Sequence, residues 1–173
     1  IVAAVKDMDG LENVLNSPCN IVFILHGDIV NIPGLVARVK TSNKLVFVHI
    51  DLIDGLSSRD IAVDYIANNT KADGIISTKP NIIKCAKSFH LLTVQRFFIL
   101  DSMALNNFGK QLSNVADAIE ILPGVMPKII RTLTRCVAKP IIAGGLITDV
   151  EDASSALNAG ATAISTSNQA LWL

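Results

Sequence analysis

Two stretches near the end of the chain, Pro140-Ile-Ile-Ala-Gly-Gly-Leu-Ile147 and Ala161-Thr-Ala-Ile-Ser-Thr-Ser-Asn168, carry the strongest signal of the fold. In each, a short apolar run typical of a buried strand leads into a turn rich in glycine or hydroxyl side chains, and then toward a helix start. Two such turns in succession are typical of the phosphate-binding end of a β/α barrel, where loops after the last two strands offer backbone N–H groups to an anion. They predict a site for a phosphorylated small molecule.

Similar apolar runs recur at intervals of about 20 residues through the rest of the chain. They predict strands over residues 1–5, 21–25, 45–50, 74–77, 91–95, 118–122, 140–143 and 162–165. Capping residues, prolines at helix starts and helical spacing of apolar residues predict helices over residues 7–16, 32–40, 59–69 and 81–89, after residue 127, and from the cap at 148–149 to the stop at 158–160.

The unbroken alternation of strands and helices predicts a parallel sheet with right-handed crossovers. Eight candidate strands favour a closed barrel, yet 173 residues are fewer than the roughly 250 of a typical (β/α)8 barrel. We therefore expect a reduced TIM-like β/α barrel of seven or eight parallel strands, with a last helix that is short or absent. An open, doubly wound sheet is the alternative. No linker or low-complexity stretch divides the chain, so residues 1–173 are expected to form one domain.

The composition narrows the classes of function. Half of the residues are apolar and 17% are charged, as expected for strands buried on both faces. A net charge of zero and few aromatic residues disfavour broad electrostatic binding or base stacking on nucleic acid. Cys19, Cys85 and Cys136 lack metal-ligand spacing and are expected to be buried small side chains in a reduced, cytosolic protein. No apolar run approaches the ~20 residues of a membrane span.

Three polar side chains in or beside apolar strands are candidates for a site at the barrel mouth. His49 and Asp51 close the third predicted strand, and alternation places both on the same face. They could hold a divalent cation, polarise a hydroxyl, or simply stiffen the barrel as a hydrogen-bonded pair. Glu120 lies inside an apolar strand and needs a cation, a metal or a hydrogen-bonded partner, for which Arg96 and an ion near His49 and Asp51 are candidates.

Further candidates follow the fourth and fifth strands. Lys79 could steer a phosphate, form a Schiff base or lie on the surface, and its position just past the strand against Pro80 favours contact with an anion. Arg96 offers a fork for phosphate or carboxylate. Asp101 could pair with Arg96 or cap the next helix.

The two glycine- and hydroxyl-rich turns supply the predicted phosphate site itself. A Gly-Gly pair often only makes a tight bend, but its combination with a hydroxyl-rich turn favours anion binding, because glycine lets the backbone come close to the ligand. The predicted phosphate-binding residues are Gly144, Gly145, Ser165, Thr166, Ser167 and Asn168, with Lys79 and Arg96. No Walker motif, nucleophile elbow or dinucleotide fingerprint is present.

The chain resembles a known family in six ordered blocks that cover nearly its whole length. These blocks are His49-Ile-Asp-Leu-Ile-Asp-Gly55, Gly74-Ile-Ile-Ser-Thr-Lys79, Gln95-Arg96 with Leu100-Asp-Ser102, Glu120-Ile-Leu-Pro-Gly124 with Pro127, Ile141-Ile-Ala-Gly-Gly-Leu146, and Ser165-Thr-Ser-Asn168 with Leu171-Trp172. They are similar to the glycerol uptake operon antiterminators, the regulators that respond to glycerol 3-phosphate. Lys79 stands where an arginine is common in that family, which keeps the charge but loses the fork.

The resemblance implies a cytoplasmic β/α barrel that senses glycerol 3-phosphate as its effector, requires no cofactor, and binds the leader mRNA of a glycerol operon to prevent termination. Lys128, Arg131 and Arg135, which recur at helical spacing, are the candidate RNA-binding residues, and a homodimer would double their face. A solvated helix face is the alternative. A second class of function is an enzyme acting on a triose phosphate or glycerophosphodiester, with His49, Asp51 and Glu120 around a cation.

Overall fold

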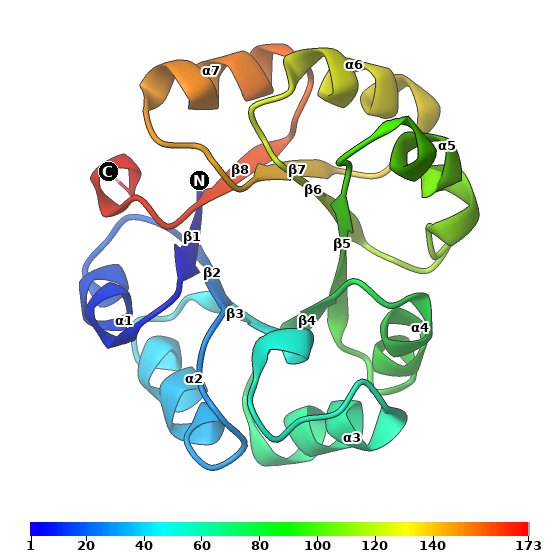
Figure 1. Cartoon of the computed structure of the whole chain (residues 1–173). Helices are drawn as coiled ribbons and strands as arrows, with labels where there is room; N and C mark the ends of the chain where they lie inside the picture. Colours follow the sequence, from blue (N-terminus) through cyan, green and yellow to red (C-terminus); the bar gives the residue numbers. More distant parts are fainter. Residues whose placement is uncertain (173) are drawn as a thin grey trace.

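The computed structural model describes residues 1–172, in which eight parallel strands close into a barrel inside a ring of seven α-helices (Figure 1). The strands are β1 (Val2–Val5), β2 (Ile21–Ile24), β3 (Leu45–His49), β4 (Gly74–Ser77), β5 (Leu92–Phe98), β6 (Ala118–Leu122), β7 (Ile141–Gly144) and β8 (Ala163–Thr166). The helices are α1 (Met8–Leu15), α2 (Ile32–Lys40), α3 (Asp60–Asn69), α4 (Pro80–Ser88), α5 (Ser102–Gln111), α6 (Pro127–Cys136) and α7 (Val150–Asn158). The predicted β/α barrel is confirmed, with eight strands, and the open sheet is excluded.

The strands pair in sequence order, and β1 closes the barrel against β8. This last pairing is short, with Val2 opposite Ser165 and Ala3 opposite Thr166. Two short 3-10 helices also occur: η1 (Ile50–Leu52) follows β3, and η2 (Gln169–Leu171) follows β8. Within the described residues, η2 is the helical element that follows β8.

Alternation along each strand divides the apolar residues between two cores. Val46 and Val48 of β3 point outward and pack beneath the helices in the largest cluster of buried side chains. Phe47 points inward and joins Phe23 of β2 and Val94 of β5 in the centre of the barrel. Strands that are buried on both faces explain why half of the sequence is apolar.

Strand β5 continues three residues beyond the predicted end at Gln95. The Gln95 side chain points away from the barrel interior, where it donates to the carbonyl of Gln111 and accepts from the N–H of Ser113. Arg96 turns inward and Phe97 packs outward against Phe108 of α5. Alternation, rather than a strand end, thus explains two adjacent polar residues in an apolar run.

The prediction for the end of β3 is also corrected. The strand stops at His49, and Asp51 lies in η1, so the alternation that was expected to place both on one face does not apply. The Asp51 carboxylate accepts hydrogen bonds from the Ser77 hydroxyl and from the N–H and hydroxyl of Thr78. It fastens the β3–α3 connection to the end of β4.

Aspartates cap three of the helices at the end of the barrel where the strands terminate. Asp7, Asp101 and Asp149 accept hydrogen bonds from the N–H groups of Gly10, Ala104 and Asp152 at 2.8, 2.7 and 2.9 Å. No helix within residues 1–172 is long and apolar enough to cross a membrane. Of the three cysteines, all free thiols, only Cys19 is buried, which corrects the prediction for Cys85 and Cys136.

Candidate functional site

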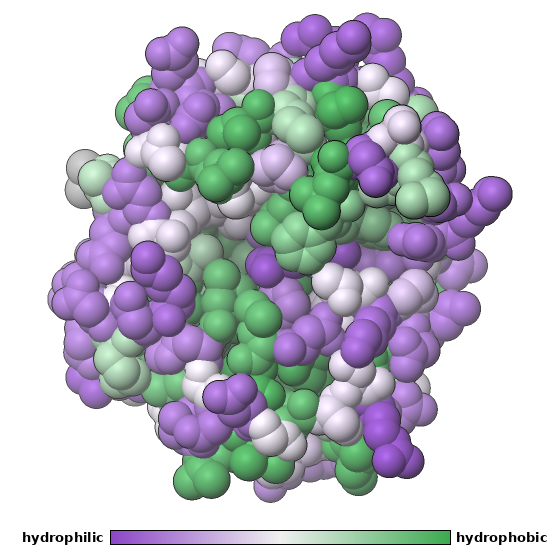
Figure 2. Space-filling view, in the orientation of Figure 1, coloured by the Kyte–Doolittle hydropathy of each residue, from purple (hydrophilic) through white to green (hydrophobic). Residues whose placement is uncertain are grey.

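A cavity of about 170 Å³ opens where the carboxyl ends of β1 and β2 and of β5 to β8 meet. It is lined by Ala4, Lys6, Leu25, Arg96, Glu120, Leu122, Gly145, Leu146, Ile147, Ser165, Thr166 and Ser167. Figure 2 shows this face, on which hydrophilic and hydrophobic side chains surround the hollow mouth of the barrel. Drug-sized ligands occupy clefts of about 300–1,000 Å³, so this volume suits a small metabolite.

A buried ion pair forms the charged wall of the cavity. Arg96 and Glu120 are register partners on β5 and β6, and both point into the barrel. The Arg96 Nε donates to Glu120 Oε2 at 2.6 Å, and the Ser165 hydroxyl donates to Glu120 Oε1 at 2.5 Å. Glu120 is 1% exposed and Arg96 7%. Burying a lone carboxylate would cost several kcal/mol, so this pairing explains how Glu120 is tolerated inside an apolar strand.

Gly144 has no side chain because the Glu120 and Ser165 side chains fill the space that one would need. A Cβ at residue 144 would lie 2.5 Å from Glu120 Oε1 and 2.7 Å from Ser165 Oγ. The carboxylate therefore lies directly against the backbone of the turn after β7. The first glycine of the predicted phosphate turn thus makes room for an acidic group.

The second glycine and its neighbour shape the turn itself. Gly145 has a φ of +74°, a backbone conformation that is unfavourable for residues with a side chain. Leu146 follows with a φ of +60°. A left-handed leucine is uncommon and tends to occur where function requires it. Both residues line the cavity, so the irregular backbone lies beside the space where a ligand would bind.

The end of β8 and the turn after it contribute three of their four predicted residues to the cavity. Ser165, Thr166 and Ser167 line it, whereas Asn168 does not. The Asn168 amide donates to the carbonyl of Thr148 at 2.6 Å and its oxygen accepts from the N–H of Ala170. Asn168 therefore holds the β8 turn against the loop that leads into α7.

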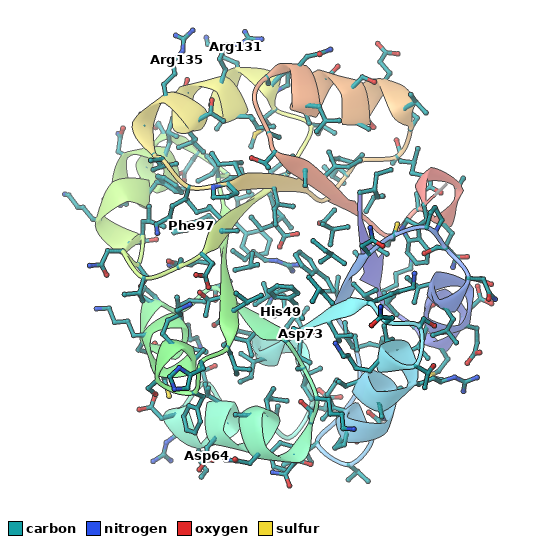
Figure 3. All side chains as sticks on the ribbon, turned by 180° about the vertical axis from the view of Figure 1, so that it is seen from behind. His49, Asp64, Asp73, Phe97, Arg131 and Arg135 are labelled. Atoms are coloured by element: carbon teal, nitrogen blue, oxygen red, sulfur yellow. The ribbon has the colours of Figure 1, made fainter. Side chains whose placement is uncertain are left out.

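His49 lies inside the barrel, near Arg96 but outside the lining of the cavity (Figure 3). Burial, and secondly the Arg96 cation, lower the pKa of His49 to about 4. Its imidazole is therefore neutral at pH 7. Its buried Nδ1 has no hydrogen-bond partner among residues 1–172.

Two other predicted residues lie away from the cavity. Lys79 is exposed at the start of α4 and does not line it. Asp101 caps α5, so the partner of Arg96 is Glu120 rather than Asp101. The sequence alone could not decide between the alternative roles of Lys79 and Asp101, because each role depends on the direction in which the side chain points.

The structure does not bring the three candidate metal ligands together. Within residues 1–172 no group of three or more His, Cys, Asp or Glu side chains is arranged to hold a metal ion. The oxygens of Asp51 bind Ser77 and Thr78, and those of Glu120 bind Arg96 and Ser165. The polar groups of this site are consequently arranged for hydrogen bonding.

Two polar residues at the mouth are missing from the sequence prediction. Lys6 follows β1 and lines the cavity, and its amine forms no ion pair within the described part of the chain. His26 follows β2, with a pKa lowered by burial against the opposing effect of Asp7, and its buried Nε2 has no partner in residues 1–172. The signal that identified Lys79, a polar residue just after an apolar run, was present at both positions.

Helix α6 presents a separate basic surface. Lys128, Arg131 and Arg135 are exposed, while Ile130 and Leu133 on the opposite face are buried. No ion pair within residues 1–172 involves any of the three cations. Figure 3 shows Arg131 and Arg135 pointing away from the barrel.

The closed β/α barrel, with a small charged cavity at the carboxyl ends of its strands, is suited to binding a small polar ligand. Residues 1–172 match the family of glycerol-3-phosphate responsive antiterminators, and the chain belongs to this family.

Known relatives agree with this assignment over almost the whole chain. A crystal structure of a glycerol uptake operon antiterminator regulatory protein from Listeria monocytogenes is 34% identical, with a TM-score of 0.94 over 99% of this chain and 93% of that one. An antiterminator-related protein from Thermotoga maritima is 35% identical, with a TM-score of 0.86 over 99% and 96%. The uncharacterized Escherichia coli protein YgcP is 40% identical over 99% of this chain and 91% of its own length.

Proposed function

We propose that this protein is a transcription antiterminator that binds glycerol 3-phosphate and, in response, the leader RNA of a glycerol-utilisation operon in the cytoplasm. The family and the Listeria relative support a regulatory rather than an enzymatic role. The binding of glycerol 3-phosphate is supported above all by the cavity in which the turns after β7 and β8 meet two cations.

The charge of the cavity suits a phosphate monoester. Its charged lining residues are Lys6, Arg96 and Glu120, two cations and one carboxylate, in a chain whose net charge is zero. Glu120 is neutralised by Arg96, so the Lys6 amine remains available to an anion. A phosphate group carries about −1.5 to −2 charges at pH 7 and accepts several hydrogen bonds. We assign it to the Gly145 turn, the Ser167 hydroxyl, Lys6 and the outer guanidinium edge of Arg96. The hydroxyls of Ser165 and Thr166 already donate to Glu120 and to the carbonyl of Ile147, so they line the cavity without a proton to offer the phosphate.

A non-enzymatic role agrees with the state of the acidic group in the cavity. Proton transfer requires a side chain that is free to give up or take a proton at the reacting atoms. Glu120 is the one carboxylate that lines the cavity, and both of its oxygens already accept hydrogen bonds, from Arg96 and Ser165. Such a group is better suited to recognition than to acid–base catalysis.

We assign RNA binding to the outer face of α6. Lys128, Arg131 and Arg135 form a row of cations without ion-pair partners in the described residues, as phosphate contacts require. Pairing of two copies in a homodimer would double this row and compensate for the low overall charge.

Titration calorimetry tests the proposed binding of glycerol 3-phosphate. Glycerol 3-phosphate is expected to bind, and glycerol to bind at least tenfold more weakly, because the phosphate supplies the charge-assisted hydrogen bonds. Gly145→Val should abolish binding, since a branched side chain strains the turn and contacts Leu122. Gly34→Ala is the control, because a Cβ there meets nothing within 4 Å. Equal affinities for glycerol and its phosphate would refute the assignment.

A gel-shift titration at low salt tests the proposed binding of leader RNA. The glycerol-operon leader RNA should bind in the presence of glycerol 3-phosphate and bind much more weakly without it. An unrelated RNA of equal length is the control. Equal binding of both RNAs, or turnover of triose phosphates or glycerophosphodiesters by the purified protein, would contradict the regulatory role.

A further inference from the structure

We infer that Glu120 recognises the hydroxyl end of the effector, so that the cavity selects phosphate esters carrying a hydroxyl donor over those carrying a carbonyl at the same carbon. This inference rests on the proposed function, in which glycerol 3-phosphate occupies the cavity. It adds a chemical reason for the choice among three-carbon phosphates.

The first step is the bonding capacity of Glu120. An ionised carboxylate accepts hydrogen bonds at about four lone-pair sites and donates none. Arg96 Nε and Ser165 Oγ occupy one site on each oxygen, at 2.6 and 2.5 Å. Because Glu120 lines the cavity, its remaining sites are available to a ligand. Only a group that donates a hydrogen bond can use them.

The second step is the polarity of the cavity. Arg96 and Glu120 form an ion pair, so the Lys6 amine and the exposed hydroxyl of Ser167 are the groups that favour the phosphate, whereas the Glu120 oxygens have no hydrogen bond to donate to it. A ligand with a phosphate at one end and hydroxyls at the other is therefore oriented, with its phosphate toward Lys6 and its hydroxyls toward Glu120. The reverse orientation would place two anionic groups in contact.

The third step is the short distance between the Glu120 carboxylate and the turn that would bind the phosphate. Gly144 carries no side chain between the Glu120 carboxylate and the turn that continues into Gly145. The acceptor and the anion-binding turn therefore lie next to each other in a cavity of about 170 Å³. A short carbon chain suffices to join them, which favours a three-carbon ester over larger sugar phosphates.

Dihydroxyacetone phosphate provides the sharpest comparison with glycerol 3-phosphate. The two differ at the central carbon, where a hydroxyl that donates is replaced by a carbonyl that only accepts. Opposite Glu120 the carbonyl donates no hydrogen bond, so the acceptor sites that Arg96 and Ser165 leave open gain none from the central carbon. Sites built to bind a hydroxyl reject analogues that lack it by large factors, about 10⁴–10⁵ in the strongest cases. We expect at least a tenfold preference for glycerol 3-phosphate.

Calorimetry with four ligands tests the inference on the unmodified protein: glycerol 3-phosphate, dihydroxyacetone phosphate, n-propyl phosphate and inorganic phosphate. The first should bind at least tenfold more tightly than each of the other three. Glu120→Gln adds an amide donor, so this variant should lose affinity for glycerol 3-phosphate and reduce its preference over dihydroxyacetone phosphate to less than threefold. Glu151→Gln, on the exposed start of α7, makes the same change away from the cavity and should keep the wild-type preference.

The outcomes separate this inference from the proposed function. Equal affinity of the wild type for glycerol 3-phosphate, dihydroxyacetone phosphate and n-propyl phosphate would overturn the role of Glu120 while leaving a phosphate-binding regulator. Absence of binding by every phosphate ester would overturn the proposed function and the inference together. The wild-type ligand series decides the question even if the Glu120→Gln protein does not fold.

Discussion

The backbone N–H of Gly124 donates to the carbonyl of Gly145 at 2.9 Å and so joins the loop between β6 and α6 to the turn after β7. A Cβ on Gly124 would lie 2.9 Å from the backbone nitrogen of Gly144, closer than side chains tolerate. The turn that lines the cavity is therefore in contact with the loop that begins the basic helix.

Gly124→Ala should displace this contact. We expect it to lower the free energy of unfolding by about 1–3 kcal/mol, as overpacking of a tight site does, and to weaken binding of glycerol 3-phosphate. Urea denaturation and calorimetry measure the two effects. Gly109→Ala in α5, where a Cβ meets nothing within 4 Å, is the matched control. Wild-type affinity and stability for Gly124→Ala would show that the loop accommodates the extra carbon.

The two lysines that follow strands β1 and β4 should differ in their effect on the ligand. Lys6→Met removes a cation from the cavity lining and is expected to weaken binding of both glycerol 3-phosphate and inorganic phosphate by tenfold or more. Lys79→Met removes an exposed cation that lies outside the lining and should change affinity by less than twofold. Calorimetry at a fixed ionic strength measures both variants. The opposite order would move the anion toward α4 and reinstate the sequence-based choice of Lys79.

His49 should make the folded state sensitive to acid. Its pKa is about 4 in the folded protein and 6.5 when unfolded, so the unfolded chain binds the extra proton between these values. Stability is therefore full above pH 6.5 and falls as the pH drops toward 4, by roughly 3 kcal/mol for a shift of this size. His49→Gln removes this titration, and its unfolding free energy should fall less between pH 7 and 4.5.

Urea denaturation at the two pH values measures this effect. His90→Asn is the control, because His90 is exposed and its left-handed backbone suits asparagine. A pH dependence of His49→Gln equal to that of the wild type would mean that His49 takes up its proton as readily in the folded protein as in the unfolded chain.

The basic face of α6 should determine the salt dependence of RNA binding. Replacing Arg131 and Arg135 together with alanine should weaken leader binding and reduce the slope of log K against log salt by about 2, one for each phosphate contact. Glycerol 3-phosphate affinity should not change, because neither residue lines the cavity. Lys84→Ala, an exposed cation on α4, is the control. An unchanged slope would place the RNA elsewhere on the barrel.

The sequence was sufficient for the architecture because the barrel depends on repeated local patterns. Buried parallel strands appear as apolar runs, and β4 and β6 have the predicted bounds. The end of β5 was mispredicted because Gln95, although polar, points outward and binds the carbonyl of Gln111. Its partners lie in a later segment, so no local rule could identify them.

The candidate site was predicted in part for the same reason. Glu120 and Arg96 stand out as charges inside apolar strands, and the structure pairs them. Asp51 was grouped with His49 on the assumption that β3 continues, whereas the chain turns into η1 and Asp51 binds the end of β4. Lys6 was missed although it follows a strand, because closure of the barrel against β8 brings it to the cavity beside the turns after β7 and β8.

The short pairing of β1 with β8 has a consequence for how the barrel holds itself shut. Only Val2 with Ser165 and Ala3 with Thr166 pair along this seam, and the cavity spans it, with Lys6 on one side and Ser167 on the other. An anion held by both residues would tie the first strand to the last. The effector would then act as a non-covalent clasp, and the occupied protein should resist opening of the barrel at the seam more than elsewhere on its circumference.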